Sequence, residues 1–173
     1  PAIGQLIKQP SLGKSLEHIA KHGRKGFYEG WIAEDIVSFL RGKGGQHTLG
    51  DFETAKGSFV QPIKTEYKGF EVWECPPNGQ GIVALEMLNI LDGFNLSSLE
   101  PLSAERLHLE IETARLAYRD RDAILADPDM SNIPIDNWLS AEYASKQRKL
   151  INRKRRAPAM PPSGLLNHMD TVY

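Results

Sequence analysis

At 173 residues, with 40% hydrophobic residues and a net charge of −1, the chain is long enough to form one domain with a real core. The nearly balanced charge gives no electrostatic indication of nucleic-acid or membrane binding, and the apolar content with three tryptophans excludes general disorder. No apolar run is long enough to span a bilayer and no signal peptide is recognisable. Because the chain starts at Pro1, we expect its true start to lie upstream.

Three helices are predicted before the middle of the chain. The first has Ser11 as its N-cap and ends at Gly23. The second is expected over residues 27–41, because its apolar residues recur at helical spacing until a run of glycines stops it. A capping signature that begins at Thr48 predicts a short helix over residues 49–55. The apolar stripe of the first helix consists of Leu12, Leu16, Ile19 and Ala20.

The stretch 61–92 is the centre of the predicted core. Alternating residues from Ile63 to Tyr67 indicate a half-buried strand, and Lys68-Gly69 predicts a tight turn into a return strand. Cys75, the single cysteine, is interpreted as a small buried residue on the same face as Phe70 and Val72. After a turn, the helix that ends at Asp92-Gly93 is apolar nearly all round, which indicates burial on more than one side.

Two further helices are predicted before an irregular tail. Ser103 is expected to cap a long helix that reaches about residue 125, and Ser140 a last helix that reaches about residue 152. From residue 153 basic residues and prolines indicate a solvated, extended segment. The residues expected to face the core are Leu107, Ile111, Ala114, Ala117 and Tyr118 in the long helix, and Tyr143, Leu150 and Ile151 in the last.

This inventory predicts a helix-rich segment with one hairpin. Two strands do not form a self-sufficient sheet, so either they extend a sheet from chain outside this sequence or the module is essentially helical. The central helix also carries more apolar surface than the hairpin covers. We therefore interpret the chain as part of a larger protein. Its expected parts are a helix-rich part over residues 1–152, with a hairpin near residues 61–75, and an extended linker over residues 153–173.

The candidate ligand sites are better explained as structural features. His18 and His22 have the spacing of two metal ligands, but no third ligand accompanies them. The pair His108 and Glu112 shares that spacing and is interpreted in the same way. Gly79-Gln80-Gly81 precedes a helix but lacks a complete phosphate-binding motif, so it is interpreted as a turn. No metal or cofactor is predicted.

Two charged runs and one threonine complete the candidates. Residues 153–156 are interpreted as a solvated linker and not as a nucleic-acid patch, because no aromatic residues accompany them. The run 118–122 favours a salt-bridge network with the following loop over acid/base machinery. Thr171 is of interest because a threonine becomes a nucleophile when its own free α-amino group acts as base, after cleavage of the preceding peptide bond.

Several short segments along the chain form an ordered set. They include Gly26-Phe27-Tyr28-Glu29-Gly30, Tyr67-Lys68-Gly69-Phe70-Glu71-Val72, Met87-Leu88-Asn89-Ile90-Leu91, Leu116-Ala117-Tyr118 with Asp120-Arg121, and Asp127-Pro128-Asp129. In this order and spacing the set resembles the γ-glutamyltransferases (γ-glutamyl transpeptidases, glutathione hydrolases). The resemblance covers nearly the whole chain, and the ordered set is more specific than any single segment.

The resemblance implies an α/β protein of the N-terminal-nucleophile hydrolase type, with αββα layers when complete, made as a proenzyme that cuts itself into two subunits. The chain is similar to the C-terminal half of the large subunit. By position Thr171 matches the catalytic nucleophile, so Asp170–Thr171 is the expected scissile bond. The family typically has Thr-Thr-His-Tyr or Thr-Thr-His-Phe there, whereas this sequence has Thr171-Val172-Tyr173, which indicates a divergent branch.

The implied activity is acyl transfer or hydrolysis of glutathione-like γ-glutamyl amides, without a cofactor. The implied partners are the small subunit, the N-terminal half of the large subunit and a small-molecule γ-glutamyl substrate, with no nucleic acid and no membrane evident. This segment alone is expected to be inactive. Family members are often periplasmic or extracellular, but the sequence does not indicate a compartment. The alternatives are a cephalosporin-acylase-like or other amidohydrolase, or a non-catalytic helical interaction module.

Overall fold

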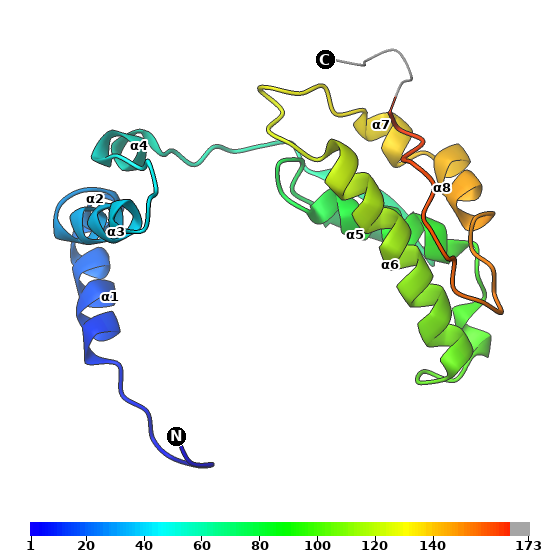
Figure 1. The fold of residues 1–173 in the computed structure, drawn as a ribbon, viewed down its shortest axis with the longest axis horizontal. Helices are drawn as coiled ribbons and strands as arrows, with labels where there is room; N and C mark the ends of the chain where they lie inside the picture. Colours follow the sequence, from blue (N-terminus) through cyan, green and yellow to red (C-terminus); the bar gives the residue numbers. More distant parts are fainter. Residues whose placement is uncertain (167–173) are drawn as a thin grey trace. The chain divides into compact units, whose positions relative to one another are not determined.

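The computed structural model describes residues 1–166, and they fall into two compact units (Figure 1). One unit runs from Pro1 to Phe59 and the other begins at Val60. Among the helices of the described residues, none combines the length and the apolar character needed to cross a membrane.

The first unit contains four helices, and two of the predicted helix starts differ in detail. Helix α1 (Pro10–His22) begins with Pro10 in its first turn, so the expected cap Ser11 lies inside the helix. The predicted helix over residues 27–41 is divided, because Gly30 has a φ of 69° that an α-helix does not continue through. The helices on its two sides are α2 (Lys25–Tyr28) and α3 (Trp31–Gly42). The capping box at Thr48 is confirmed at the start of α4 (Leu49–Thr54).

Little of the first unit is buried. Only α3 among its long helices contributes fully buried apolar side chains, namely Ile32, Ala33 and Val37. The predicted stripe on α1 is not covered within the described residues, since Leu12 and Leu16 are 50% and 57% exposed. Arg24 joins the first helices to the end of α4, because its guanidinium donates to the backbone oxygens of Glu53 and Ala55.

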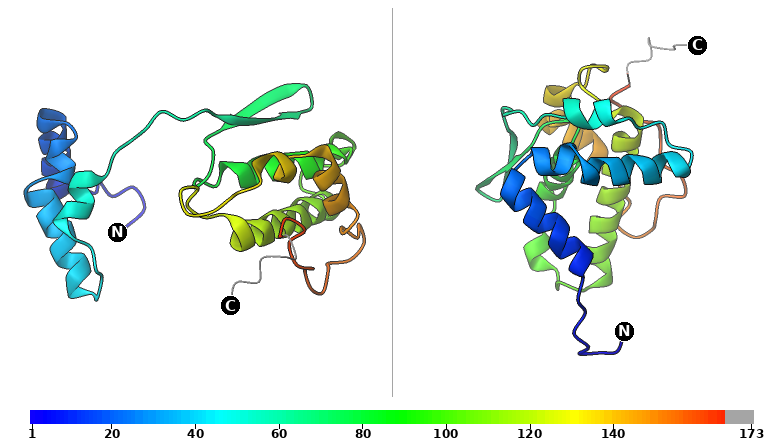
Figure 2. Two further views of the ribbon diagram at one scale, coloured as in Figure 1. Left: turned by 90° about the horizontal axis from the view of Figure 1, so that it is seen from above. Right: turned by 90° about the vertical axis from the view of Figure 1, so that its left-hand side faces the viewer.

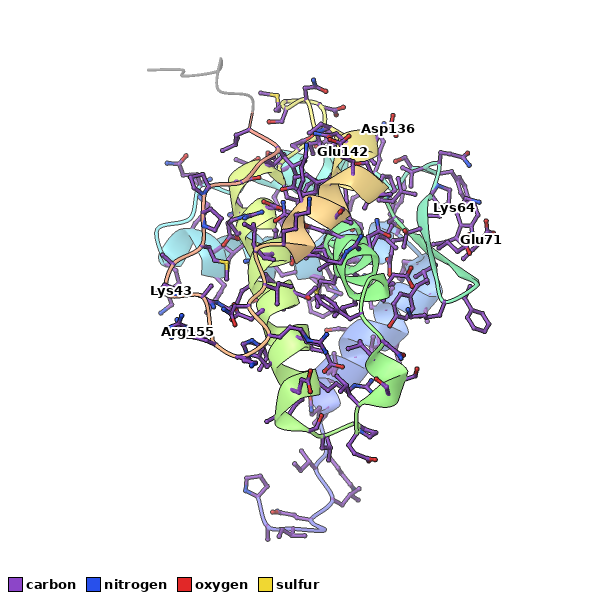
Figure 3. All side chains as sticks on the ribbon, turned by 90° about the vertical axis from the view of Figure 1, so that its right-hand side faces the viewer. Lys43, Lys64, Glu71, Asp136, Glu142 and Arg155 are labelled. Carbon is purple, nitrogen blue, oxygen red and sulfur yellow. The ribbon has the colours of Figure 1, made fainter. Side chains whose placement is uncertain are left out.

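The second unit opens with the predicted hairpin. Strands β1 (Ile63–Tyr67) and β2 (Phe70–Glu74) pair antiparallel, and Tyr67 lies opposite Phe70. Lys68 and Gly69 have positive φ values of 52° and 84°, as a two-residue hairpin turn requires. On the outer face of the hairpin the side chains of Lys64 and Glu71 form an ion pair (Figure 3).

The expectation that Cys75 is buried is wrong. Cys75 is exposed because side chains alternate between the two faces along β2, and a residue three positions after Val72 lies on the opposite, outward face. The inward face of β2 is formed instead by Val72 and Glu74, which are half-buried, while Phe70 is exposed.

Helix α5 (Gly81–Asp92) is the centre of the second unit, as predicted. It lies between the hairpin and helix α6 (Ala104–Ile124), as the views in Figure 2 show. The short α7 (Ile135–Trp138) and α8 (Ala141–Arg148) complete the helical layer, and a 3₁₀ turn, η1 (Leu96–Ser98), connects α5 to α6. The apolar residues of α5 that are buried are Ile82, Val83, Leu85, Ile90 and Leu91.

Helix α6 starts at the predicted cap Ser103 but buries a different face from the one predicted. Of the residues expected inside, Ala117 is buried as predicted, whereas Leu107, Ile111 and Tyr118 are 39%, 57% and 45% exposed. The helix is turned so that a face containing two carboxylates packs against its neighbours, because each of these carboxylates has bonding partners there. The buried residues of α6 are Leu109, Glu112, Thr113, Leu116, Ala117 and Asp120.

The C-terminal part of the described chain is irregular but packed. The last helix starts at the predicted cap Ser140 and buries Tyr143, as expected, but it ends at Arg148 and leaves Leu150 42% exposed. After it no helix or strand follows within the residues described, to residue 166. Residues 153–156 are solvated, as expected, whereas Leu165 is only 5% exposed and belongs to the main apolar cluster.

Gly81 is expected to resist substitution because there is no space for a side chain. A Cβ atom there would lie 2.6 Å from the Glu74 Cβ and 2.9 Å from the Cys75 carbonyl oxygen. We expect Gly81→Ala to lower the free energy of unfolding by about 1–3 kcal/mol, despite the better helix propensity of alanine. Chemical denaturation measures this.

The matched control is Gly79→Ala in the same turn. Its new Cβ would make only ordinary contact, 3.7 Å from the Pro76 carbonyl oxygen. We expect the free energy of unfolding to change by less than about 0.5 kcal/mol. Equal losses in both variants would contradict the steric explanation.

Candidate functional site

The sequence-predicted nucleophile lies outside the described residues, which end at residue 166. Thr171 and the Asp170–Thr171 bond are therefore not placed. The described chain does contain the route towards them, since residues 157–165 run beside α6 (Figure 1). The groups that hold this route are the charged and polar side chains buried between α5, α6 and α8.

Asp120 on α6 is the most enclosed of these groups. Its side chain has no exposed surface, and the Arg119 guanidinium lies 2.7 Å from Oδ1. The Tyr143 hydroxyl on α8 donates to Oδ2 at 2.6 Å. Ion pairs were predicted for residues 118–122, and they are present. However, the sequence predicted partners on the following loop, whereas those of Asp120 lie on α6 and α8.

Glu86 on α5 faces the same buried space. Its side chain is 1% exposed, and the Trp138 indole N–H donates to Oε2 at 2.6 Å. The pKa of Glu86 is raised to about 9, mainly by burial. A hydrogen bond with Asp120 and the negative charge of Asp120 raise it further. Its Oε1 has no hydrogen-bond donor among the described residues, which fits a protonated oxygen that itself donates to Asp120.

Tyr143 connects this pair of carboxyl groups to the C-terminal segment. Burial and the neighbouring Asp120 raise the pKa of the Tyr143 hydroxyl, so it stays protonated and donates. The ring lies against Gly164, where an added Cβ would be 3.3 Å from Cε2. The polar cluster is thus formed by Glu86, Arg119, Asp120, Trp138, Tyr143 and Gln147.

A second group on α6 binds the chain at Ala157. Glu112 Oε2 accepts the Ala157 N–H at 3.0 Å, while Arg115 donates to the Ala157 oxygen at 3.1 Å and pairs with Glu112 at 2.6 Å. Burial opposes ionisation of Glu112, but the hydrogen bonds from Ala157 and Arg115 outweigh it and lower its pKa. The neighbouring His108 ring bonds to the Asn152 oxygen at 2.7 Å. Glu112 and His108 therefore bind backbone groups of the C-terminal segment, at Ala157 and Asn152 respectively.

The remaining candidates also have structural roles. The rings of His18 and His22 are in tilted contact with centroids 4.5 Å apart, and His18 also packs against Trp31 in a T-shaped arrangement. Across residues 1–166 no cluster of three or more His, Cys, Asp or Glu side chains has the geometry to hold a metal ion. Gln80 is the N-terminal flanking residue of α5, and Gly81 is required there by its contacts with β2.

The arrangement can position a chain but offers no open acid/base group to a substrate. Asp120, Glu86 and Glu112 are all nearly inaccessible to solvent, and each is paired. Sequence reasoning missed Glu86 and Trp138. The available signal was Glu86 itself, a carboxylate in the middle of a mostly apolar helix, because such a residue is buried only when it has partners.

The stability of the second unit is expected to fall as pH rises. The pKa of Glu86 is about 9 in the folded chain against 4.5 for the free group, so unfolding releases one proton between these values. The contribution of Glu86 is fully present below its unfolded pKa and is lost as pH rises through its folded pKa. The slope is at most about 1.4 kcal/mol of unfolding free energy per pH unit.

Glu86→Gln is expected to remove this dependence. The amide retains one acceptor for Trp138 and one donor for Asp120, but it does not titrate. Chemical denaturation should therefore show that the free energy of unfolding of the wild type falls between about pH 5 and about pH 8. The fall should be smaller in the variant. Glu142→Gln is the control, because Glu142 is 78% exposed and has a lowered pKa. Equal pH slopes for the wild type and Glu86→Gln would refute a protonated Glu86.

The sequence matches one protein family over its full length. The family model described as gamma-glutamyltranspeptidase covers residues 1–173. The chain is 38% identical over 173 residues to the glutathione hydrolase-like YwrD proenzyme of Bacillus subtilis (strain 168), across 100% of this chain and 32% of that protein. The chain thus spans about a third of the length of this curated relative.

Two solved structures are similar to the fold. The crystal structure of Helicobacter pylori gamma-glutamyltranspeptidase matches with a TM-score of 0.77 and 29% identity, over 96% of this chain and 49% of that one. The crystal structure of the cephalosporin acylase from Bacillus halodurans matches with a TM-score of 0.71 and 35% identity, over 88% of this chain and 28% of that one.

Proposed function

The chain belongs to the γ-glutamyltranspeptidase family, and from this premise we propose that it is part of a self-processing γ-glutamyl acyltransferase or hydrolase. Thr171 is the proposed nucleophile, and Asp170–Thr171 is the proposed processing bond. Residues 153–173 form the connection to this bond. The proposed partners are the other parts of the same proenzyme and a small γ-glutamyl amide such as glutathione.

The proposed chemistry has two stages. In processing, the Thr171 Oγ attacks the Asp170 carbonyl carbon and the amide C–N bond breaks as its nitrogen gains the hydroxyl proton, which leaves an Asp170 ester and a free amine on Thr171. Water then hydrolyses this ester, which leaves a carboxylate on Asp170 and restores the Thr171 hydroxyl. The free amine then takes the proton from the Thr171 Oγ as the oxygen attacks the γ-glutamyl carbonyl. The C–N bond breaks, the leaving amine gains the proton, and a glutamyl ester remains on Thr171. Water or an amino acid then attacks the ester, which releases glutamate or a new γ-glutamyl amide.

The observation that carries this proposal is the family match over the full length of the chain, residues 170 and 171 included. The relative from Bacillus subtilis is aligned over all 173 residues and is itself named as a proenzyme.

A second candidate keeps the architecture and changes the acyl group. The cephalosporin acylase of Bacillus halodurans is 35% identical to this chain, a higher identity than that of the Helicobacter pylori enzyme. An amidohydrolase that acts on another acyl amide is therefore the alternative. A non-catalytic helical module is the third candidate, and it requires that Thr171 is incidental.

Intact-mass analysis of the complete gene product tests the proposal. We expect two fragments, the smaller beginning at Thr171, and release of amine from a γ-glutamyl amide. Hydrolysis of a cephalosporin side-chain amide instead would favour the acylase. A chain that stays uncut and inactive on both amides would refute the enzyme assignment and favour the non-catalytic module.

A further inference from the structure

We infer that α6 sets the register of the chain leading to the processing bond, with Glu112, Arg115, Arg119 and Tyr143 as positioning residues. The inference rests on the proposed role of Thr171. The attachment of residues 157–165 to α6 determines where the chain continues.

The attachment has two points, and both lie on one face of α6. The first anchor consists of Glu112 and Arg115, which together bind the N–H and the C=O of Ala157. A slide that puts Pro158 in place of Ala157 would leave Glu112 without its backbone donor, because proline has no N–H. A slide in the other direction would put the Arg156 backbone there and is opposed by the second anchor, where Leu165 is buried. The two anchors together therefore specify the register.

The second anchor consists of Arg119 and Tyr143, held by Asp120. Arg119 donates to the Pro161 oxygen at 3.4 Å and also bonds to Gln147 and Asp120. The Tyr143 ring lies against Gly164. Apolar contacts reinforce this anchor, since Met160 and Leu165 pack against the buried clusters beneath α6 and α8.

The distance between the two anchors along α6 agrees with the length of the segment, residues 157–161, that joins them. From Glu112 to Arg119 the helix rises about 11 Å, at about 1.5 Å per residue. From Ala157 to Pro161 an extended chain covers up to about 13 Å. Residues 157–161 therefore run parallel to α6 and are close to fully extended between the two anchors. Upstream of Ala157, in contrast, residues 153–156 are all exposed, so added length can be accommodated there.

Two single-residue insertions in the complete proenzyme test the register. One alanine is inserted between Arg155 and Arg156, before both anchors, and in a second variant between Leu166 and Asn167, after them. We expect the first insertion to leave the rate of processing unchanged. The second insertion should slow processing by about 100-fold, because displacing the reacting groups from their productive geometry lowers the rate by about this factor. Similar rates for the two insertions would overturn the inference.

Hydrogen exchange tests the first anchor independently of cleavage. In an uncut Thr171→Ala proenzyme the Ala157 amide should be protected, and Glu112→Ala should speed its exchange at least about 10-fold. Glu110→Ala is the matched control: Glu110 lies on α6 but pairs with Arg106, so Ala157 exchange should not change. Free exchange of Ala157 in the parent would refute the anchor. Absence of cleavage in the wild type would refute only the proposed function, since the exchange result stands without it.

Discussion

A proenzyme that carries Thr171→Ala is expected to remain a single chain and to lose turnover by at least about 1,000-fold. The reason is chemical: the γ-oxygen is the atom that attacks the acyl carbonyl, and alanine has none. Intact mass reports processing, and release of amine from a γ-glutamyl amide reports turnover. Thr171→Ser is the matched control, because serine keeps the hydroxyl, and we expect it to be processed.

Processing and turnover are separated by supplying the two subunits as separate chains. A small subunit that begins with Thr171 carries a free α-amino group without any cleavage step, so the assembled pair should be active. The same subunit beginning with alanine should be inactive although its amine is equally free. Activity of the alanine form would show that another residue is the nucleophile.

Local signals predicted the elements of this chain well. Thr48, Ser103 and Ser140 are helix caps in the structure, and each has its predicted side-chain bond to a backbone N–H. The hairpin turn at Lys68-Gly69 and the buried helix α5 also follow from residues close in sequence. The helix-rich fold with one hairpin is thereby confirmed, as is the similarity to N-terminal-nucleophile hydrolases of the γ-glutamyltranspeptidase family.

The buried face of α6 was not predictable from its own residues. Apolar periodicity favoured Leu107, Ile111 and Tyr118, whereas the structure buries Glu112 and Asp120. Burial of these carboxylates depends on partners that are distant in sequence, on α8 and at Ala157. A pattern within one helix cannot contain that information, because the energy of a buried charge is decided by what surrounds it.

The candidate site was predictable only in part. The position of Thr171 came from a resemblance to a family, since nothing in its neighbourhood distinguishes this threonine chemically. The composition of the tail predicted a solvated segment and so concealed the packing of Ser163 and Leu165. A single small or apolar residue among prolines does not indicate burial in the sequence. Ser163 and Leu165 are buried because they fill space between α6 and α8.

Asp120→Ala is expected to lower the free energy of unfolding by about 3–5 kcal/mol, the cost of breaking a buried ion pair by removing one partner. The Arg119 guanidinium, 11% exposed, would lose its counter-charge, and the Tyr143 hydroxyl would lose its acceptor. Chemical denaturation measures the loss. The pKa of Glu86 should fall at the same time, because the Asp120 carboxylate raises it, so the pH slope of stability should become smaller.

Asp122→Ala is the matched control, because it removes the same side chain two residues further along the same helix. Asp122 is 66% exposed and pairs only with the neighbouring Arg121, so we expect a change below about 0.5 kcal/mol. A similar loss in both variants would mean that the helix end, and not the buried pair, determines stability. A large loss confined to Asp120 would show that the buried carboxylate, and not the helix end, stabilises the second unit.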